Sequence, residues 1–140
     1  MHTTDEAARN LLHVVEAWHR AVNDGDSERL LTLASPDIEM VGPRSTSRGR
    51  EVLADWLSRA GLSYVPVRWF SDGVERVVVE ERVTWRDVGT GELVDEKLVA
   101  SRFLASEGVI ICYARHDDVR SALDAAGLGA SDEVTPPAAR

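Results

Sequence analysis

Two arginines in the second half of the chain, Arg82 and Arg115, stand within runs of residues that are typical of β-strands. A charge buried by a folded sheet must be paired or must hold a ligand, because an unpaired charge in an apolar interior costs too much free energy. A guanidinium can bind a carboxylate or an enolate oxygen through two parallel hydrogen bonds. We therefore expect Arg82 and Arg115 to bind an oxygen-bearing ligand.

Strand geometry gives each arginine its neighbours. Successive side chains of a strand point to opposite faces, so Glu80, Arg82 and Thr84 share one face. Tyr113 shares a face with Arg115 in the same way, and its hydroxyl can donate a hydrogen bond. We assign both faces to the inside of a pocket, and we expect Thr84 and Tyr113 to contact the ligand.

Two glutamates, Glu39 and Glu80, are the candidate general bases. An apolar wall raises the pKa of a carboxyl group and an adjacent arginine lowers it, so a glutamate in such a site can be tuned for proton transfer. The alternative is a structural network of ion pairs, Glu39 with Arg82 and Glu80 with Arg115. Trp18 either packs the core or lines the cavity, and we include it among the candidate ligand contacts.

The other face of the strand that carries Arg82 is apolar, with Val77, Val79, Val83 and Trp85. We expect it to be the convex face of the sheet, covered by a second copy of the chain in a homodimer. One alternative is that the two faces are exchanged and these residues form the core. Another is a non-catalytic association domain, which dimerises and has a filled interior without a ligand.

In the first half of the chain apolar residues recur at helical spacing, and in the second half they recur at every second position. Amphipathic helices are expected over 5–23, around Leu30, over 48–60 and over 119–126, with a short strand at 37–41. Between residues 64 and 118, short links that contain glycine predict antiparallel strands. This order predicts one α+β domain over 5–128, and the proline-containing segment 129–140 is expected to be disordered.

Composition excludes several classes of function. The chain has 140 residues and a formal net charge of −8, from 16 Lys and Arg against 24 Asp and Glu. That balance argues against a nucleic-acid-binding protein, which needs a basic face. The sequence has no apolar run of the length that spans a bilayer and no signal peptide, so we expect a cytoplasmic protein without a membrane partner.

The same sequence gives no indication of a metal or cofactor. Cys112 is the only cysteine, so neither a disulfide within the chain nor a cysteine metal cluster can form. His13 and His19 are six positions apart on one helix, which is not the spacing of metal ligands. Glycine-rich loops of the phosphate-binding type are also missing. We expect neither a metal nor a cofactor.

Three segments carry a resemblance to a known superfamily. They are AWHRAVNDGDSERLLTLASPDIEM at 17–40, GREVLADWL at 49–57 and EGVIICYARHDDVRSALDAAGL at 107–128. Over residues 5–128 the chain resembles the nuclear transport factor 2-like superfamily. This superfamily includes SnoaL-like polyketide cyclases, ketosteroid isomerases and limonene-epoxide hydrolases. The resemblance implies a cystatin-like α+β cone, in which N-terminal helices pack on a strongly curved antiparallel or mixed sheet around a pocket.

The catalytic residues of these relatives are mostly missing. The resemblance places Gly42 where ketosteroid isomerases have an aspartate base before a proline. Thr84 and Arg115 stand where the epoxide hydrolases have two aspartates, so Arg82 alone matches that pattern. We therefore expect a pocket that binds a small, mostly apolar metabolite with an oxyanion or carboxylate, and the sequence leaves open whether the protein transforms it by acid–base chemistry.

Overall fold

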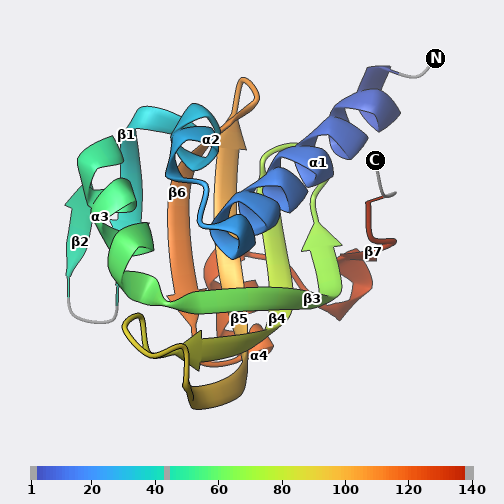
Figure 1. The fold of residues 1–140 in the computed structure, drawn as a ribbon. Helices are drawn as coiled ribbons and strands as arrows, with labels where there is room; N and C mark the ends of the chain where they lie inside the picture. The colour runs from blue at the N-terminus through green and yellow to red at the C-terminus, as the bar shows by residue number, and fades with distance from the viewer. Residues whose placement is uncertain (1–2, 43–44, 138–140) are drawn as a thin grey trace.

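A computed structural model describes residues 3–42 and 45–137 of the chain, arranged as a curved sheet with helices on both faces (Figure 1). Pro43, which follows the position of the missing isomerase base, lies outside these residues. The helices are α1 (Thr3–Asp24), α2 (Ser27–Thr32), α3 (Arg50–Ala60), α4 (Val119–Ala126) and the 3-10 turn η1 (Ala130–Asp132). The strands are β1 (Ala34–Val41), β2 (Thr46–Arg48), β3 (Leu62–Ser71), β4 (Arg76–Arg86), β5 (Leu93–Ser106), β6 (Val109–His116) and β7 (Glu133–Val134).

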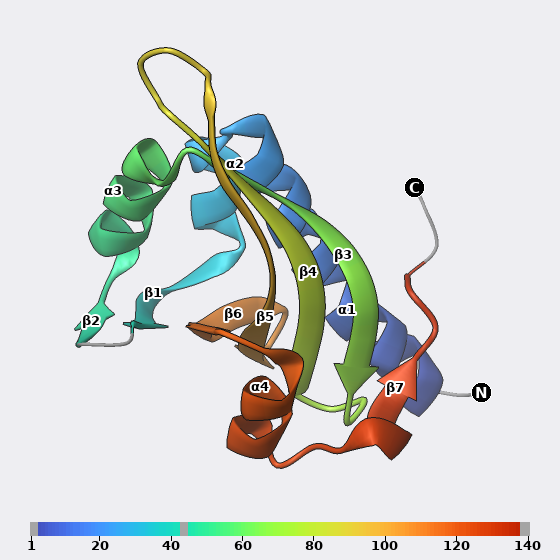
Figure 2. The ribbon, with the colours of Figure 1, turned by 90° about the horizontal axis from the view of Figure 1, so that it is seen from below.

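These strands form one seven-stranded sheet in the order β2-β1-β6-β5-β4-β3-β7. Strands β3 to β6 follow one another as antiparallel neighbours, whereas β1 pairs with β6 in parallel. Figure 2 shows β3, β4 and β5 bending together. The strand register shifts between Pro66 and Arg68 in β3 and between Leu104 and Ala105 in β5. Such irregularities in the pairing bend the strands. The predicted α+β cone of the nuclear transport factor 2-like type is confirmed.

The concave face of the sheet, which we call the inner face, carries the main core. Helix α1 lies across it and buries an apolar stripe that includes Val15, Trp18 and Val22. Leu53 of α3 and Ile38 of β1 belong to the same cluster. The apolar stripe was predicted from helical spacing, because a surface helix must bury one face.

The opposite face, which we call the outer face, has its own smaller cluster. Helix α4 packs there and buries Ala122 and Ala126 against Phe70, Val78 and Ala100. The helix begins where the Asp118 side chain accepts a hydrogen bond from the backbone N–H of Ser121, as the sequence predicted for Asp117 or Asp118. Both faces of the central strands are therefore covered by helices over part of their length.

The two faces of β4 are exchanged relative to our expectation. Val77, Val79 and Val83 are fully buried in the inner core, so they are not available to a dimer partner. Glu80 and Arg82 lie on the outer face instead, as does Thr84. The physical reason is that Val77, Val78 and Val79 are all buried, which leaves no clean alternation to mark the solvent side. The alternative that we left open, with these valines in the core, is the observed one.

The C-terminal segment also differs from expectation. Residues 130–134 form η1 and β7, and Val134 pairs with Trp69 of β3 and packs against the inner core. The turn is held by the Asp132 carboxylate, which accepts a hydrogen bond from the N–H of Gly129. Pairing with an open sheet edge compensates for the polar composition from which we predicted disorder. Residues 138–140 lie outside the described part of the chain.

Over residues 3–42 and 45–137, none of the helices has the length and apolar character needed to cross a bilayer.

Candidate functional site

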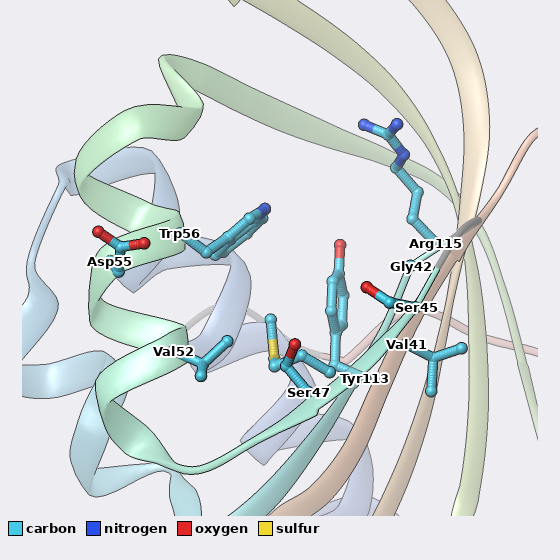
Figure 3. A pocket seen from close by; sticks show the side chains of 10 residues that line it. Val41, Gly42, Ser45, Ser47, Val52, Asp55, Trp56, Tyr113 and Arg115 are labelled. Carbon is cyan, nitrogen blue, oxygen red and sulfur yellow. The ribbon is translucent and has the colours of Figure 1, made fainter.

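A cavity of about 450 Å³ opens between α3 and the edge of the sheet formed by β1, β2 and β6. Figure 3 shows Trp56 extending into it from α3, opposite Tyr113 and Arg115 of β6. Its lining combines apolar walls with a few polar groups, which is typical of a small-molecule site. The lining residues are Met40, Val41, Gly42, Ser45, Ser47, Val52, Asp55, Trp56, Tyr113 and Arg115.

Helix α3 is placed by a glycine at its start. Gly49 has φ 108°, a conformation that other residues rarely adopt, and its N–H donates to the carbonyl of Ile38. The helix then buries Leu53 against the core. Val52 and Trp56 are four positions apart, so they share the helix face that borders the cavity.

Tyr113 forms the inner end of the cavity. Its ring stacks on Trp18 with centroids 5.1 Å apart, and it also contacts Trp56 at 5.7 Å. Its hydroxyl lies 2.8 Å from the Tyr64 hydroxyl and 3.1 Å from Ser101 Oγ. Burial and the nearby Glu81 carboxylate raise the pKa of Tyr113, and burial raises that of Tyr64 as well. Both hydroxyls therefore keep their protons and act as hydrogen-bond donors.

Behind Tyr113 lies a buried pair of titratable groups, His19 of α1 and Glu81 of β4. The exposed fraction is 2% for His19 and 0% for Glu81. The imidazole Nε2 is 2.5 Å from Glu81 Oε2, and Ser101 Oγ donates to Glu81 Oε1 over 2.7 Å. His19 Nδ1 is 2.8 Å from the carbonyl oxygen of Val15, which can only accept. Nδ1 therefore carries a hydrogen, and Nε2 and Oε2 share a single proton.

The electrostatics of this pair favour a protonated carboxyl group. Burial raises the pKa of Glu81, because a charged carboxylate is poorly solvated in the protein interior. Hydrogen bonds from His19 and Ser101 and the positive charge of Arg115 act in the opposite direction, and burial is the largest effect. Glu81 is thus a stronger base than an ordinary glutamate.

Among the described residues that line the cavity, Arg115 supplies the positive charge. Its guanidinium carbon lies 5.3 Å from the centroid of the Trp85 ring, in a cation–π contact. Tyr113 and Arg115 both extend from β6 toward the cavity (Figure 3). A ligand oxygen at this end would meet a hydroxyl and a cation together.

The structure brings together only some of the residues that we selected from the sequence. Tyr113 and Arg115 line the cavity, and Trp18 supports Tyr113 from the fully buried core. The remaining four lie on the outer face, away from the cavity. They are Glu39, Glu80, Arg82 and Thr84.

The predicted ion pairs are also replaced by others. Glu39 pairs with Arg48 at 3.1 Å. Glu80 pairs with Arg68 at 2.7 Å rather than with Arg115. The cause is the exchange of faces, since the outer-face partners are neighbours across β1–β2 and β3–β4.

Three buried polar residues, Glu81, His19 and Ser101, were missed from the sequence, and so was Tyr64. Glu81 stands between Val79 and Val83 on an otherwise apolar strand face, and this single interruption is the signal that the sequence offers. Among residues 3–42 and 45–137, no group of three or more His, Cys, Asp or Glu side chains is placed to hold a metal ion.

Comparison with known proteins shows the family to which the chain belongs. The sequence model of the SnoaL-like domain matches residues 15–109. A search of curated protein sequences finds no match. Similar solved structures include a putative polyketide cyclase from Xanthomonas campestris. It has 18% identity and a TM-score of 0.65, and 85% of this chain and 96% of that chain are covered.

Two further structures share the fold. An LEH-like epoxide hydrolase from M. tuberculosis has 20% identity and a TM-score of 0.64, and 84% of this chain and 89% of that chain are covered. A hypothetical protein from Catenulispora acidiphila, solved with trimethylamine, is described as having a ketosteroid isomerase-like fold. It has 22% identity and a TM-score of 0.64, covering 88% and 97% of the two chains. The chain belongs to the SnoaL-like domain family and has the nuclear transport factor 2-like fold.

Proposed function

We propose that this protein binds a small, mostly apolar molecule with an acidic hydroxyl or carboxylate oxygen, and that it transforms it by acid–base chemistry. The observation that carries the proposal is the pairing of Tyr113 and Arg115 at one end of a cavity with apolar walls. The volume of about 450 Å³ suits a small metabolite.

Arg115 and Tyr113 have distinct roles in holding the ligand oxygen. The guanidinium of Arg115 attracts an anionic oxygen and can bind it through two hydrogen bonds. The Tyr113 oxygen lies at the same end of the cavity and can accept a hydrogen bond from an acidic ligand hydroxyl. Trp56 and Val52 bury the apolar part of the ligand, which accounts for most of the area removed from water.

The relatives are consistent with a small-molecule role. One is described as an epoxide hydrolase, one as a putative polyketide cyclase, and one was solved with trimethylamine. Their identities are too low to transfer a reaction to this chain. A cytoplasmic location remains a prediction, which the single cysteine favours.

Binding of 4-nitrophenol, a small aromatic with an acidic hydroxyl, tests the proposal. Quenching of the tryptophan fluorescence reports occupancy, because one of the four tryptophans, Trp56, lines the cavity. We expect Arg115→Met to weaken binding about tenfold, the loss of one charge-assisted hydrogen bond. Arg82→Met is the matched control, since Arg82 lies on the outer face. Equal affinities for the wild type and the Arg115→Met variant would contradict the proposal.

A second candidate function, association of two copies, is favoured by one row of the outer face. Val65, Arg82 and Leu98 are direct neighbours across β3, β4 and β5. The exposed fractions are 63% for Val65 and 47% for Leu98, which is unusual for apolar side chains in the middle of a sheet. Glu96 lies two positions from Leu98, so a two-fold related copy could place a carboxylate near Arg82. We propose a homodimer through this row.

A further inference from the structure

We infer that a line of buried polar side chains carries a proton from a ligand hydroxyl in the cavity to the interior of the cone. The line consists of Tyr113, Ser101, Glu81 and His19. It rests on the proposed function, because the ligand must place its hydroxyl against Tyr113. It also names the ligand class more narrowly, as a phenol or an enol.

The direction of the hydrogen bonds follows from the fixed end of the line. Ser101 has one hydroxyl hydrogen and donates it to Glu81 Oε1 over 2.7 Å. Its oxygen is therefore left to accept, and the Tyr113 hydroxyl at 3.1 Å is the donor. Tyr64, 2.8 Å from Tyr113, then donates to the Tyr113 oxygen. That oxygen retains one acceptor position, which a ligand hydroxyl can fill.

The proton transfer balances atom by atom. The ligand O–H bond breaks and a new O–H bond forms on Tyr113, while the original hydrogen of Tyr113 moves to Ser101 Oγ. The original hydrogen of Ser101 moves to Glu81 Oε1. Each hydroxyl gives one proton and receives one, so no tyrosinate is formed. The ligand becomes an oxyanion, and the His19–Glu81 pair holds two protons instead of one.

The charges around the pair suit this transfer. Glu81 is faced by His19 from α1, by Ser101 from β5, and by Tyr113 and Arg115 from β6. Burial raises the pKa of Glu81, so its carboxyl group stays protonated when Oε1 receives the new hydrogen, and the shared hydrogen moves to His19 Nε2. Arg115 lies at the cavity end of the line, where it neutralises the oxyanion left on the ligand.

A second cavity, of about 300 Å³, reaches the pair from another side. It is lined by α1, by β3 and by the segment after β7, through residues that include His19, Glu16, Arg20, Trp69 and Pro136. The first cavity is lined by β1, β2, α3 and β6 instead. The ring of His19 therefore borders a second opening, while its two nitrogens remain bonded to Val15 and Glu81.

Absorbance of bound 4-nitrophenol tests the relay, because the phenol and the phenolate have different spectra. At a pH below the pKa of the free probe, we expect the wild type to bind it as the phenolate. In Glu81→Gln, the side-chain amide can still form hydrogen bonds with His19 and Ser101, but it cannot accept a proton. We expect the ratio of phenolate to phenol in the bound probe to fall about tenfold in this variant. Glu80→Gln, one position away on the outer face, is the control and should behave as the wild type.

The size of the effect separates a relay from a purely electrostatic role. The His19–Glu81 pair is neutral before the transfer and Glu81→Gln removes no net charge, so an electrostatic role predicts an unchanged ratio. Ser101→Ala should also lower the ratio, and Ser101→Thr, which restores a hydroxyl, should recover it. This second pair of variants decides the question if Glu81→Gln does not fold.

The possible failures are distinguishable. If the wild type binds the probe but leaves it as the phenol, the relay is wrong and the binding proposal stands. If Glu81→Gln or Ser101→Ala ionises the probe as the wild type does, Arg115 alone is responsible and the relay is again wrong. If the wild type does not bind the probe, the proposed function fails and the relay fails with it.

Discussion

His19 Nε2 and Glu81 Oε2 lie 2.5 Å apart in the interior of the cone, although the two residues are 62 positions apart in the chain. A buried pair of this kind is tolerated only when its remaining polar atoms are also satisfied. Here they are, because Val15 accepts from His19 Nδ1 and Ser101 donates to Glu81 Oε1. The pair therefore links α1 to β4 and β5, in a place where an apolar contact would hold the elements equally well.

The stability of the protein should depend on pH through Glu81. Its pKa is raised in the folded state by burial, so the folded protein binds this proton more tightly than the unfolded chain does. The resulting stabilisation is complete below the ordinary glutamate pKa, about 4.3, and is lost as the pH rises through the folded value. We expect the free energy of unfolding to fall in this window by at most about 1.4 kcal/mol per pH unit.

Urea denaturation of the wild type and of Glu81→Gln, from about pH 4 to about pH 8, measures this dependence. The amide that replaces the carboxyl group in this variant cannot titrate, so the curve of the variant should be flatter across the window. Glu80→Gln should retain the wild-type slope. Parallel curves for the wild type and Glu81→Gln would mean that Glu81 binds its proton no more tightly in the folded state.

Tyr113→Phe should reduce ligand affinity while retaining the fold. Its ring keeps the contacts with Trp18, Phe103 and Trp56, so the core remains packed. The lost hydroxyl removes one hydrogen bond to the ligand, and we expect 4-nitrophenol to bind roughly fivefold to tenfold more weakly. Fluorescence titration measures the change.

Tyr64→Phe is the matched control for this experiment. It removes the neighbouring hydroxyl of the same network, but Tyr64 is fully buried and lies behind Tyr113. Its affinity for the probe should stay within about twofold of the wild type. A larger loss in Tyr64→Phe than in Tyr113→Phe would argue that the network, rather than direct contact, holds the ligand.

Sequence periodicity predicted the elements well and the faces of the sheet poorly. Helix α1 and the strands from β3 to β6 follow from spacing, because a helix or a strand must bury a regular set of positions. The prediction that Glu80 and Arg82 face the pocket was wrong. Helix α4 covers part of the outer face, so both faces of β4 carry apolar residues and polarity alone does not identify the inner one. Tyr113 and Arg115 both line the cavity, since they are two positions apart on β6 and share one face of the strand.

The buried pair was beyond the reach of periodicity. Glu81 breaks an apolar face, and such a residue gains a partner only through contacts that are distant in sequence. Its partner, His19, comes from a helix at the other end of the domain. Ser101 in β5 completes the site because β4 and β5 pair in a register that places it beside Val79, two positions from Glu81. That register is set by the whole hairpin, and no local pattern reveals it.

The segment after α4 should contribute measurably to stability. Ending the chain at Gly129 removes β7 and the packing of Val134 on the inner core. We expect a loss of about 1 kcal/mol and a fall in the melting temperature of roughly 2–4 °C, measured by calorimetry. A chain that ends at 137 keeps β7 and serves as the control. An unchanged melting temperature in the shorter chain would show that β7 adds no stability.

The outer-face row formed by Val65, Arg82 and Leu98 predicts the association state. We expect the wild type to sediment as a dimer at micromolar concentration. Leu98→Arg should shift it toward the mass of a monomer, because the substitution places a second cation beside Arg82 and removes exposed apolar surface from the interface. Val74→Arg is the control, since Val74 is 75% exposed in the link between β3 and β4, away from this row. A monomeric wild type would contradict the dimer, and so would a Leu98→Arg variant that dimerises as strongly as Val74→Arg.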